Sequence, residues 1–205
     1  MTTEINLYLA SQSPRRSELL TQIGVPFTVL AVNIDETVKA KESPEDYVIR
    51  LAKEKASAGW IITKNTNKAV LGSDTAVVIE GVILGKPKDN NDAKRMLNLL
   101  SGKTHQVMTA VALVVPSENA EIAEPRTVIS VSEVSFKRLL TTEIEQYVYS
   151  GECDDKAGSY AIQGLAAAFI THLSGSYSGV MGLPLYETLE LLNNAGIRQD
   201  SLVLS

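Results

Sequence analysis

The sequence predicts an α/β fold, in which buried strands alternate with amphipathic helices. An apolar run at residues 7–10 has the length of a buried strand and passes directly into a helical pattern over residues 14–23. Two longer apolar strands, at residues 69–79 and 106–115, are separated by a helix that Asp89 caps. No repeat, low-complexity tract or linker interrupts this alternation.

Composition limits the classes of function. The formal net charge of -5 argues against a nucleic-acid-binding surface, which needs a basic face, although a local group of cations can still bind a small anion. Residues 1–6 carry no basic run before an apolar stretch, so no secretory signal is expected. The charge-free residues 157–186 are too rich in glycine and polar side chains for a membrane span.

Cysteine and histidine are scarce. Residues 1–205, which we expect to form a single domain, contain one cysteine, Cys153, and this is typical of a reducing cytoplasm. With two histidines beside it, a structural zinc site is not expected. Any metal would be a hard cation held by carboxylates.

The first turn from strand to helix predicts an anion site. Ser13 is a suitable N-cap, Pro14 suits the first helical position, and Gly24 ends the helix. Free backbone amides at the helix start, together with Arg15 and Arg16, favour a phosphate group there. The alternative is a capped helix with a solvated arginine pair.

Two features of the next segment have more than one interpretation. A second strand, at residues 27–32, runs into Asp35 and Glu36, which either hold a magnesium-like ion or belong to a solvated loop. The following helix is capped by Ser43. Lys55 lies in the middle of its apolar stripe, so this side chain either snorkels to solvent or faces inward as an anion ligand.

Asp74 interrupts an apolar run. Residues 69–79 would be one buried strand but for residues 72–75, and a carboxylate at this point must be paired, metal-bound or at the edge of a cleft. Residues 82–84 are expected to return as the second strand of a hairpin. That hairpin would place Lys86 near the level of Asp74.

The second half of the chain supports weaker predictions. In the expected strand at residues 127–136 the apolar pattern slips between Val131 and Val134, which suggests a bulge. Thr142 and Glu145 fit a capping box for a short helix.

The charge-free segment at residues 157–186 is expected to form buried strands separated by tight turns, before a last helix that begins at Pro184. Within it, Gln163 can offer a donor and an acceptor to a nucleobase edge. The alternative is an ordinary, satisfied polar group.

Six short motifs occur in the order found in the Maf family of nucleotide pyrophosphatases, and the sequence resembles that family from about Leu7 to Gly196. The motifs span residues 11–16, 54–56, 72–75, 85–87, 101–105 and 160–164. Each is weak alone, but six in order are specific. The resemblance implies a mixed central sheet split into two lobes around a cleft, related to the inosine triphosphate pyrophosphatases. It also implies hydrolysis of a nucleoside triphosphate to monophosphate and pyrophosphate with a divalent cation, Mg²⁺ or Mn²⁺.

The resemblance also implies a substrate class. The family branch that acts on dTTP and UTP has Arg, Thr and Gln at the positions of Arg15, Thr75 and Gln163. On this basis Thr75 and Gln163 are expected to recognise the base, and modified uridine triphosphates are further candidate substrates.

Roles for the remaining residues follow from the needs of phosphoanhydride cleavage. Positive charge would come from Arg15, Arg16, Lys55 and Lys86, beside the helix start at Ser13. Asp74 would accept the proton of the attacking water or hold it through the metal, and Glu36 would be a second metal ligand.

Two other functions are compatible with the sequence. One is the same reaction on another base, such as 7-methyl-GTP. The other is a nucleotide-binding regulator of cell division with little catalysis, against which the combination of Asp74 with the cations argues. The expected partner is a small nucleoside triphosphate rather than nucleic acid or membrane, and a homodimer is a family-level expectation.

Overall fold

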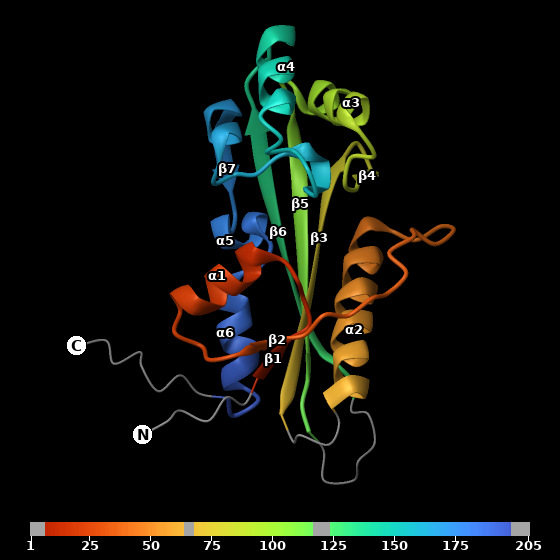
Figure 1. Ribbon diagram of the computed structural model, residues 1–205, viewed down its shortest axis with the longest axis vertical. Helices are drawn as coiled ribbons and strands as arrows, with labels where there is room; N and C mark the ends of the chain where they lie inside the picture. Colours follow the sequence, from red (N-terminus) through yellow and green to blue (C-terminus); the bar gives the residue numbers. More distant parts are fainter. Residues whose placement is uncertain (1–6, 64–67, 117–123, 198–205) are drawn as a thin grey trace, which may run out of the picture.

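The computed structural model describes residues 7–63, 68–116 and 124–197 as an elongated α/β fold with helices on both faces of a twisted sheet (Figure 1). The strands are β1 (Leu7–Leu9), β2 (Thr28–Val29), β3 (Ala69–Ile79), β4 (Val82–Leu84), β5 (Thr104–Val114), β6 (Arg126–Phe136) and β7 (Ile170–Ser174). The helices are α1 (Pro14–Gln22), α2 (Pro44–Thr63), α3 (Asn90–Leu100), α4 (Thr141–Tyr149), α5 (Tyr177–Met181) and α6 (Leu185–Asn193). Two short 3₁₀ helices are η1 (Ala157–Ser159) and η2 (Leu165–Phe169). Within these ranges, no helix has the length and apolarity needed to cross a membrane.

The sheet is mixed, as expected. Its strand order is β2-β1-β3-β5-β6-β7, with β1 parallel to β2 and β3 and the other pairs antiparallel. Strands β1 and β4 share one edge of β3: β1 pairs with residues 69–71 and β4 with residues 77–79. Residues 72–76 therefore have no strand partner on this edge within the described residues. We call this gap in the sheet the notch.

The turns at either end create the notch. Strand β1 ends because residues 11–13 turn the chain into α1. The β3–β4 hairpin closes through Glu80 and Gly81, whose φ angles of 51° and 79° suit a tight two-residue turn. The break in the apolar pattern at residues 72–75 does not interrupt β3, which runs through it as one strand.

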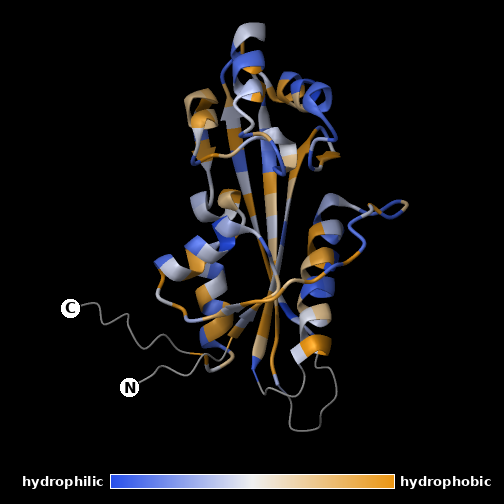
Figure 2. Cartoon of the chain, viewed as in Figure 1, coloured by the Kyte–Doolittle hydropathy of each residue, from blue (hydrophilic) through white to orange (hydrophobic). Residues whose placement is uncertain are grey.

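Three hydrophobic clusters surround the sheet. Helices α1 and α6 pack with β1 on one face, and α2 packs on the other face, where Val70 and Ala112 are fully buried. Helices α3 and α4 cover the first face beyond the notch, where Val77 and Val107 begin a third cluster. The exposed helices α2 and α6 show hydrophobic and hydrophilic residues in alternation along their length (Figure 2).

Polar residues separate the two clusters on the first face. Their side chains carry hydroxyl groups, and they come from three neighbouring strands: Ser73, Thr75, Thr109, Ser130 and Ser132. We call this row the hydroxyl band. Helix α5 lies over it and supplies hydrogen-bond partners, including the carbonyl oxygen of Gly179.

The hydroxyl band explains why the bulge predicted between Val131 and Val134 is wrong. The β5–β6 register is regular from Thr104 to Leu113, and the irregularity of β6 lies later, at Ser135/Phe136, against β7. Serines of the band occupy buried positions of β6, whereas Val131 is 45% exposed, so hydrophobicity does not report the direction of these side chains.

Several boundaries differ from the prediction. Only Thr28–Val29 of the predicted strand at 27–32 forms one. Helix α4 begins at Thr141, so its N-cap is Leu140 and not Thr142 as predicted. The amide of Leu140 donates to the side chain of Glu143, the role that we predicted for Glu145. Ser43 caps α2 as predicted, since the Asp46 amide donates to Ser43 Oγ (3.1 Å).

The charge-free segment at residues 157–186 contains one strand, β7, rather than several. Two 3₁₀ helices, α5 and turns fill the rest of it, because glycines with positive φ, such as Gly158 (66°) and Gly182 (116°), turn the chain repeatedly. The last helix follows Pro184 as predicted, with this proline as its N-cap.

Candidate active site

The candidate site lies at the notch. Ten of the eleven residues of β3 are buried, and Thr75 is the exception. The Ala10 amide donates to the Leu71 carbonyl (2.8 Å), so the backbone groups of Leu71 point toward the edge of β3 where β1 lies. Because every second residue of a strand directs its backbone groups to the same edge, those of Ser73 and Thr75 point into the notch. Asp74 points to the other face of the sheet, and its side chain is 9% exposed. A carboxylate this buried is costly unless it is paired.

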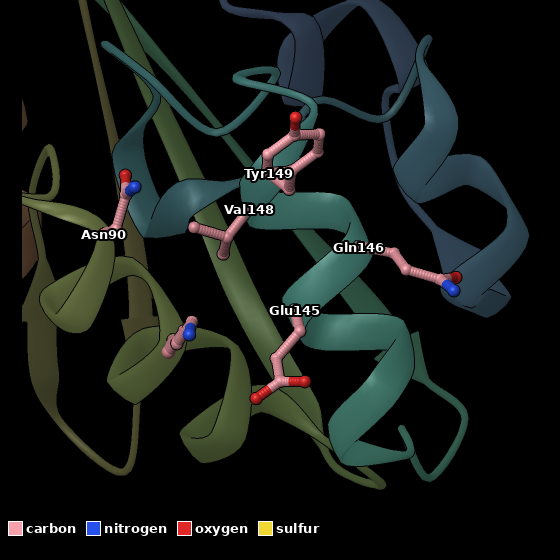
Figure 3. Close-up of a pocket in the computed structure, with 6 residues that line it drawn as sticks. Asn90, Glu145, Gln146, Val148 and Tyr149 are labelled. Atoms are coloured by element: carbon pink, nitrogen blue, oxygen red, sulfur yellow. The ribbon is translucent and has the colours of Figure 1, made fainter.

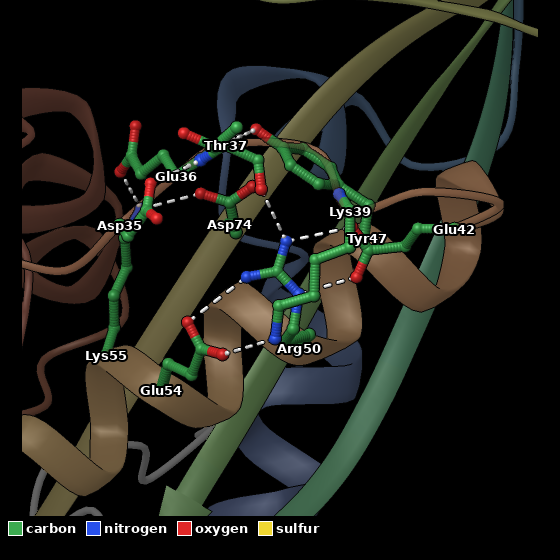
Figure 4. Close-up of polar contacts among 10 residues, drawn as sticks. All are labelled: Asp35, Glu36, Thr37, Lys39, Glu42, Tyr47, Arg50, Glu54, Lys55 and Asp74. Carbon is green, nitrogen blue, oxygen red and sulfur yellow. Dashed lines mark hydrogen bonds and ion pairs between the residues drawn. The ribbon is translucent and has the colours of Figure 1, made fainter.

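Lys55 is the partner of Asp74. Its Nζ lies 2.6 Å from Asp74 Oδ1 and 2.7 Å from Glu36 Oε1, so two carboxylates converge on one ammonium (Figure 4). Helix α2 approaches β3 this closely because residue 72 is glycine: a Cβ on Gly72 would lie 2.4 Å from the carbonyl oxygen of Ala52. Lys55 therefore faces inward, with a side chain 12% exposed, rather than snorkelling to solvent.

The two carboxylates have different proton affinities. Burial raises the pKa of Asp74 above its usual value, although the charges of Lys55 and Arg16 oppose this shift. Burial also disfavours ionisation of Glu36, but the hydrogen bond and charge of Lys55 bring the pKa of Glu36 below its usual value. Asp74 is therefore the better proton acceptor of the two.

A network of polar contacts holds the loop that carries Glu36. The Tyr47 hydroxyl donates to the Glu36 carbonyl (3.0 Å), and Arg50 Nη2 donates to the Thr37 carbonyl (3.1 Å) (Figure 4). Arg50 Nη2 also donates to Glu42 Oε2 (2.8 Å), which anchors the loop to α2. The loop is exposed, so these contacts give Glu36 a defined position.

Arg16 reaches the other side of the notch from α1. Its Nε donates to the Gly182 carbonyl (2.8 Å), its Nη1 to Ser11 Oγ (3.0 Å) and its Nη2 to Thr75 Oγ1 (3.2 Å). Burial lowers the pKa of Arg16, but an arginine stays protonated. Ser13 is the N-cap of α1 as predicted, and its hydroxyl makes no capping hydrogen bond.

Arg15 and Lys86 lie farther from Asp74. The Nε of Arg15 is buried without a partner among the described residues, and burial lowers the pKa of this side chain. Glu18 and Tyr147 of α4 oppose this lowering of the Arg15 pKa, whereas Asp74 does so for Arg16, so the two neighbouring arginines face different groups. Lys86 is exposed, and its charge contributes to the lowered pKa of Glu36.

Gln163 is exposed and lies in a turn between η1 and η2, not in a strand. Glu152 holds this turn: its Oε2 accepts the Leu165 amide (2.8 Å), and its Oε1 accepts the Tyr147 hydroxyl (3.0 Å). The Tyr147 hydroxyl in turn accepts the Ala161 amide (3.3 Å). The turn is thus fixed on both sides of Gln163.

The structure places five predicted site residues in two contacting groups at the notch: Arg16 with Thr75 on one face of the sheet, and Lys55 with Glu36 and Asp74 on the other. It does not bring Ser13, Arg15, Lys86 and Gln163 into hydrogen-bond contact with them in the described parts of the chain. Residues that hold the site but were not singled out from the sequence include Ser11, Tyr47, Arg50, Thr109 and Gly182. Ser11 was detectable, since it stands beside the predicted anion site.

The donor set fits a hard divalent cation. Carboxylate oxygens of Glu36 and Asp74 already share one cation, the Lys55 ammonium. Asp35 turns away and accepts the Thr37 amide (2.9 Å). Within the described ranges no group of three or more acidic, histidine or cysteine side chains could hold a metal, so water and phosphate oxygens would complete the coordination that Mg²⁺ prefers.

A surface hollow of about 400 Å³ lies elsewhere, between α3 and α4 (Figure 3). Its lining residues are Asn90, Lys94, Glu145, Gln146, Val148 and Tyr149. None of the predicted site residues lines it. The candidate site is therefore defined by its charged groups and by the notch rather than by this hollow.

Two relatives match this chain over nearly its whole length. Proteins named dTTP/UTP pyrophosphatase from Pseudoalteromonas atlantica and Aliivibrio fischeri are 52% and 54% identical to it, covering 95% and 93% of this chain and 99% and 98% of their own. A crystal structure of a nucleoside-triphosphatase, dITP/XTP pyrophosphatase, from Mycobacterium abscessus aligns with a TM-score of 0.38 at 19% identity, over 65% of this chain and 73% of that one. The profile of the Maf-like proteins matches residues 6–195, a range that includes the notch and every residue described around it, and the chain belongs to this family.

Proposed function

We propose that the protein is a nucleoside triphosphate pyrophosphatase that hydrolyses dTTP and UTP, and modified uridine triphosphates, to the monophosphate and pyrophosphate. The observation that carries the reaction is the buried Asp74 carboxylate, paired with Lys55 beside a notch that Arg16 enters from the other side. The names of relatives 52% and 54% identical to this chain support the substrates. The single Cys153 supports a cytoplasmic location.

In this proposal the reaction is one hydrolytic step. A water oxygen forms a bond to the α-phosphorus, the P–O bond from the α-phosphorus to the α–β bridging oxygen breaks, and pyrophosphate leaves with that oxygen and its electron pair. Asp74 accepts a proton from the water, for which its raised pKa suits it. Arg16 and Lys55, with Lys86 and Arg15 farther out, bind the phosphate oxygens and offset their growing charge.

The carboxylates of Glu36 and Asp74 would hold the divalent cation, Mg²⁺ or Mn²⁺, beside the notch. When bound, the cation neutralises charge on the phosphate oxygens. Thr75 is the one residue of β3 that is only half-buried, and its hydroxyl lies beside Arg16. Gln163 lies on a turn that Glu152 holds, and we assign base recognition to these two residues. The amide of Gln163 can pair with the imide edge of uracil or thymine, which cytosine lacks.

The test is pyrophosphate release from dTTP, UTP, CTP and 7-methyl-GTP with Mg²⁺ or Mn²⁺. Wild type should release pyrophosphate from dTTP and UTP, and Asp74→Asn should lower turnover by about 10²- to 10⁴-fold. Asp155→Asn is the matched control, because Asp155 is exposed and its φ of 55° suits asparagine. Activity retained by a folded Asp74→Asn protein would remove Asp74 as the base.

Other outcomes of the same assay separate the alternatives. Release from 7-methyl-GTP in preference to UTP would replace the pyrimidine assignment, and Gln163→Ala should change the order of substrates more than the overall rate. Binding of UTP without release from any triphosphate would favour a nucleotide-binding regulator and overturn the proposal.

A further inference from the structure

Three hydrogen bonds form a chain that runs from Arg16 through Thr75 and Thr109 to the carbonyl oxygen of Gly179. Arg16 Nη2 lies 3.2 Å from Thr75 Oγ1, which lies 2.9 Å from Thr109 Oγ1, which lies 2.8 Å from the carbonyl oxygen of Gly179. Thr75 and Thr109 are directly opposite each other on β3 and β5, in the middle of the hydroxyl band. Each threonine hydroxyl has one proton to donate and two lone pairs to accept with.

The two ends of the chain fix where the protons lie. The Gly179 carbonyl can only accept, and Thr109 is fully buried. Without a proton between them, the lone pairs of the Thr109 hydroxyl oxygen and the Gly179 carbonyl oxygen would repel each other at 2.8 Å, and burial away from water makes this repulsion costly in free energy. The proton of Thr109 therefore points at Gly179.

The direction of the remaining bond follows. Because Thr109 has no second proton, Thr75 must donate in the bond between the two threonines. The guanidinium of Arg16 can only donate, so it occupies one lone pair of Thr75. Thr75 is left with one lone pair and no proton to give.

We infer that Thr109 fixes Thr75 as a hydrogen-bond acceptor, so that the group of the substrate which contacts Thr75 is a donor. This inference rests on the proposed function and adds a rule of selection to it. The ring N–H of uracil and thymine is such a donor, whereas the ring nitrogen of cytosine at the same position is an acceptor. Thr109 touches no substrate in this scheme and acts as a positioning residue.

Thr109→Val tests the inference, because valine keeps the shape of threonine and removes the hydroxyl. Thr75 would then be free to donate, and the ratio of kcat/KM for UTP to that for CTP should fall about tenfold, the worth of one hydrogen bond. Thr109→Ser should restore the wild-type ratio. Thr188→Val is the matched control, since Thr188 is also fully buried and its hydroxyl has no partner within the described structure.

A second variant keeps the test open if Thr109→Val does not fold. Thr75→Val should lower kcat/KM for UTP more than for CTP, because in the wild type the Thr75 oxygen offers nothing to cytosine. The inference would be overturned if the ratio of kcat/KM for UTP to that for CTP were unchanged in folded Thr109→Val, or if it changed equally in Thr188→Val. In either case, release of pyrophosphate from UTP by the wild type would leave the proposed function standing. No release by the wild type from any triphosphate would instead overturn the proposed function.

Discussion

Gly72→Ala should damage both the fold and the site, because Gly72 is where α2 meets β3. The added methyl would lie 2.4 Å from the Ala52 carbonyl oxygen and 2.6 Å from the Ala56 nitrogen, both backbone atoms of α2. Ordinary contact begins at 3.4 Å, so the helix must move by about 1 Å. Overpacking of this kind costs about 3 kcal/mol, which lowers Tm by roughly 6–12 °C in a protein of this size.

The same movement carries Lys55 away from Asp74. A misplacement of about 1 Å at a catalytic site can cost on the order of 100-fold in rate, so kcat/KM for UTP should fall far more than the melting temperature alone suggests. Thermal unfolding and pyrophosphate release at a temperature where the variant is folded measure the two effects separately.

Gly85→Ala is the control for Gly72→Ala. A Cβ on Gly85 would meet no heavy atom within 4 Å, and Gly85 is not in the left-handed region. Its Tm should stay within about 2 °C of the wild type, since a surface substitution is usually worth less than about 0.5 kcal/mol. If Gly72→Ala were as stable and active as Gly85→Ala, the close approach of α2 to β3 would not hold the site.

Three further results are expected. Glu152→Ala should free the turn that carries Gln163 and reduce the preference for UTP over CTP, and it should lower Tm by roughly 2–12 °C because the buried Tyr147 hydroxyl loses its acceptor; an unchanged preference would show that the turn keeps its conformation without Glu152. Arg50→Ala should release the Glu36 loop and weaken Mn²⁺ binding, measured by calorimetry without nucleotide, whereas a wild-type affinity would contradict this role. Burial lowers the pKa of His105 from 6.5 to about 4, so the unfolded chain binds a proton at this side chain more readily than the folded protein does. The free energy of unfolding should therefore decrease by up to about 3 kcal/mol as the pH falls from 6.5 to about 4. The Tm of His105→Gln should depend less on pH in that range, and an equal dependence would contradict this role.

Much of the site was predictable because its residues break local patterns. A carboxylate within the apolar run of β3 and a lysine within the apolar stripe of α2 are each unusual at a buried position. In the structure these two residues, Asp74 and Lys55, form an ion pair with each other. The strand-to-helix turn before α1 and the mixed α/β fold were predictable for a similar reason, since caps and periodicity are local properties. Local sequence cannot show that Gly182 contacts Arg16 or that Thr109 contacts Thr75, because these contacts join segments far apart in the chain.

The errors have the opposite cause. Hydrophobicity predicts burial only where the buried face is apolar, and the hydroxyl band buries Ser130 and Ser132 while Val131 faces outward. In the segment around Gln163, short apolar runs between glycines satisfy strand and 3₁₀ patterns equally well. The choice there is made by Glu152, whose carboxylate accepts the amide of Leu165 at the start of η2.

An open strand edge usually invites another chain to pair with it, which is a route to aggregation. The notch exposes backbone groups of β3 at such an edge, but only over residues 72–76, a length of about 17 Å closed at one end by β1 and at the other by β4. A strand from a second molecule could not extend past either end, and it would meet the charge of Arg16 on the way in. Dividing the edge between a parallel and an antiparallel neighbour thus leaves the backbone open to a small molecule while denying it to a second polypeptide.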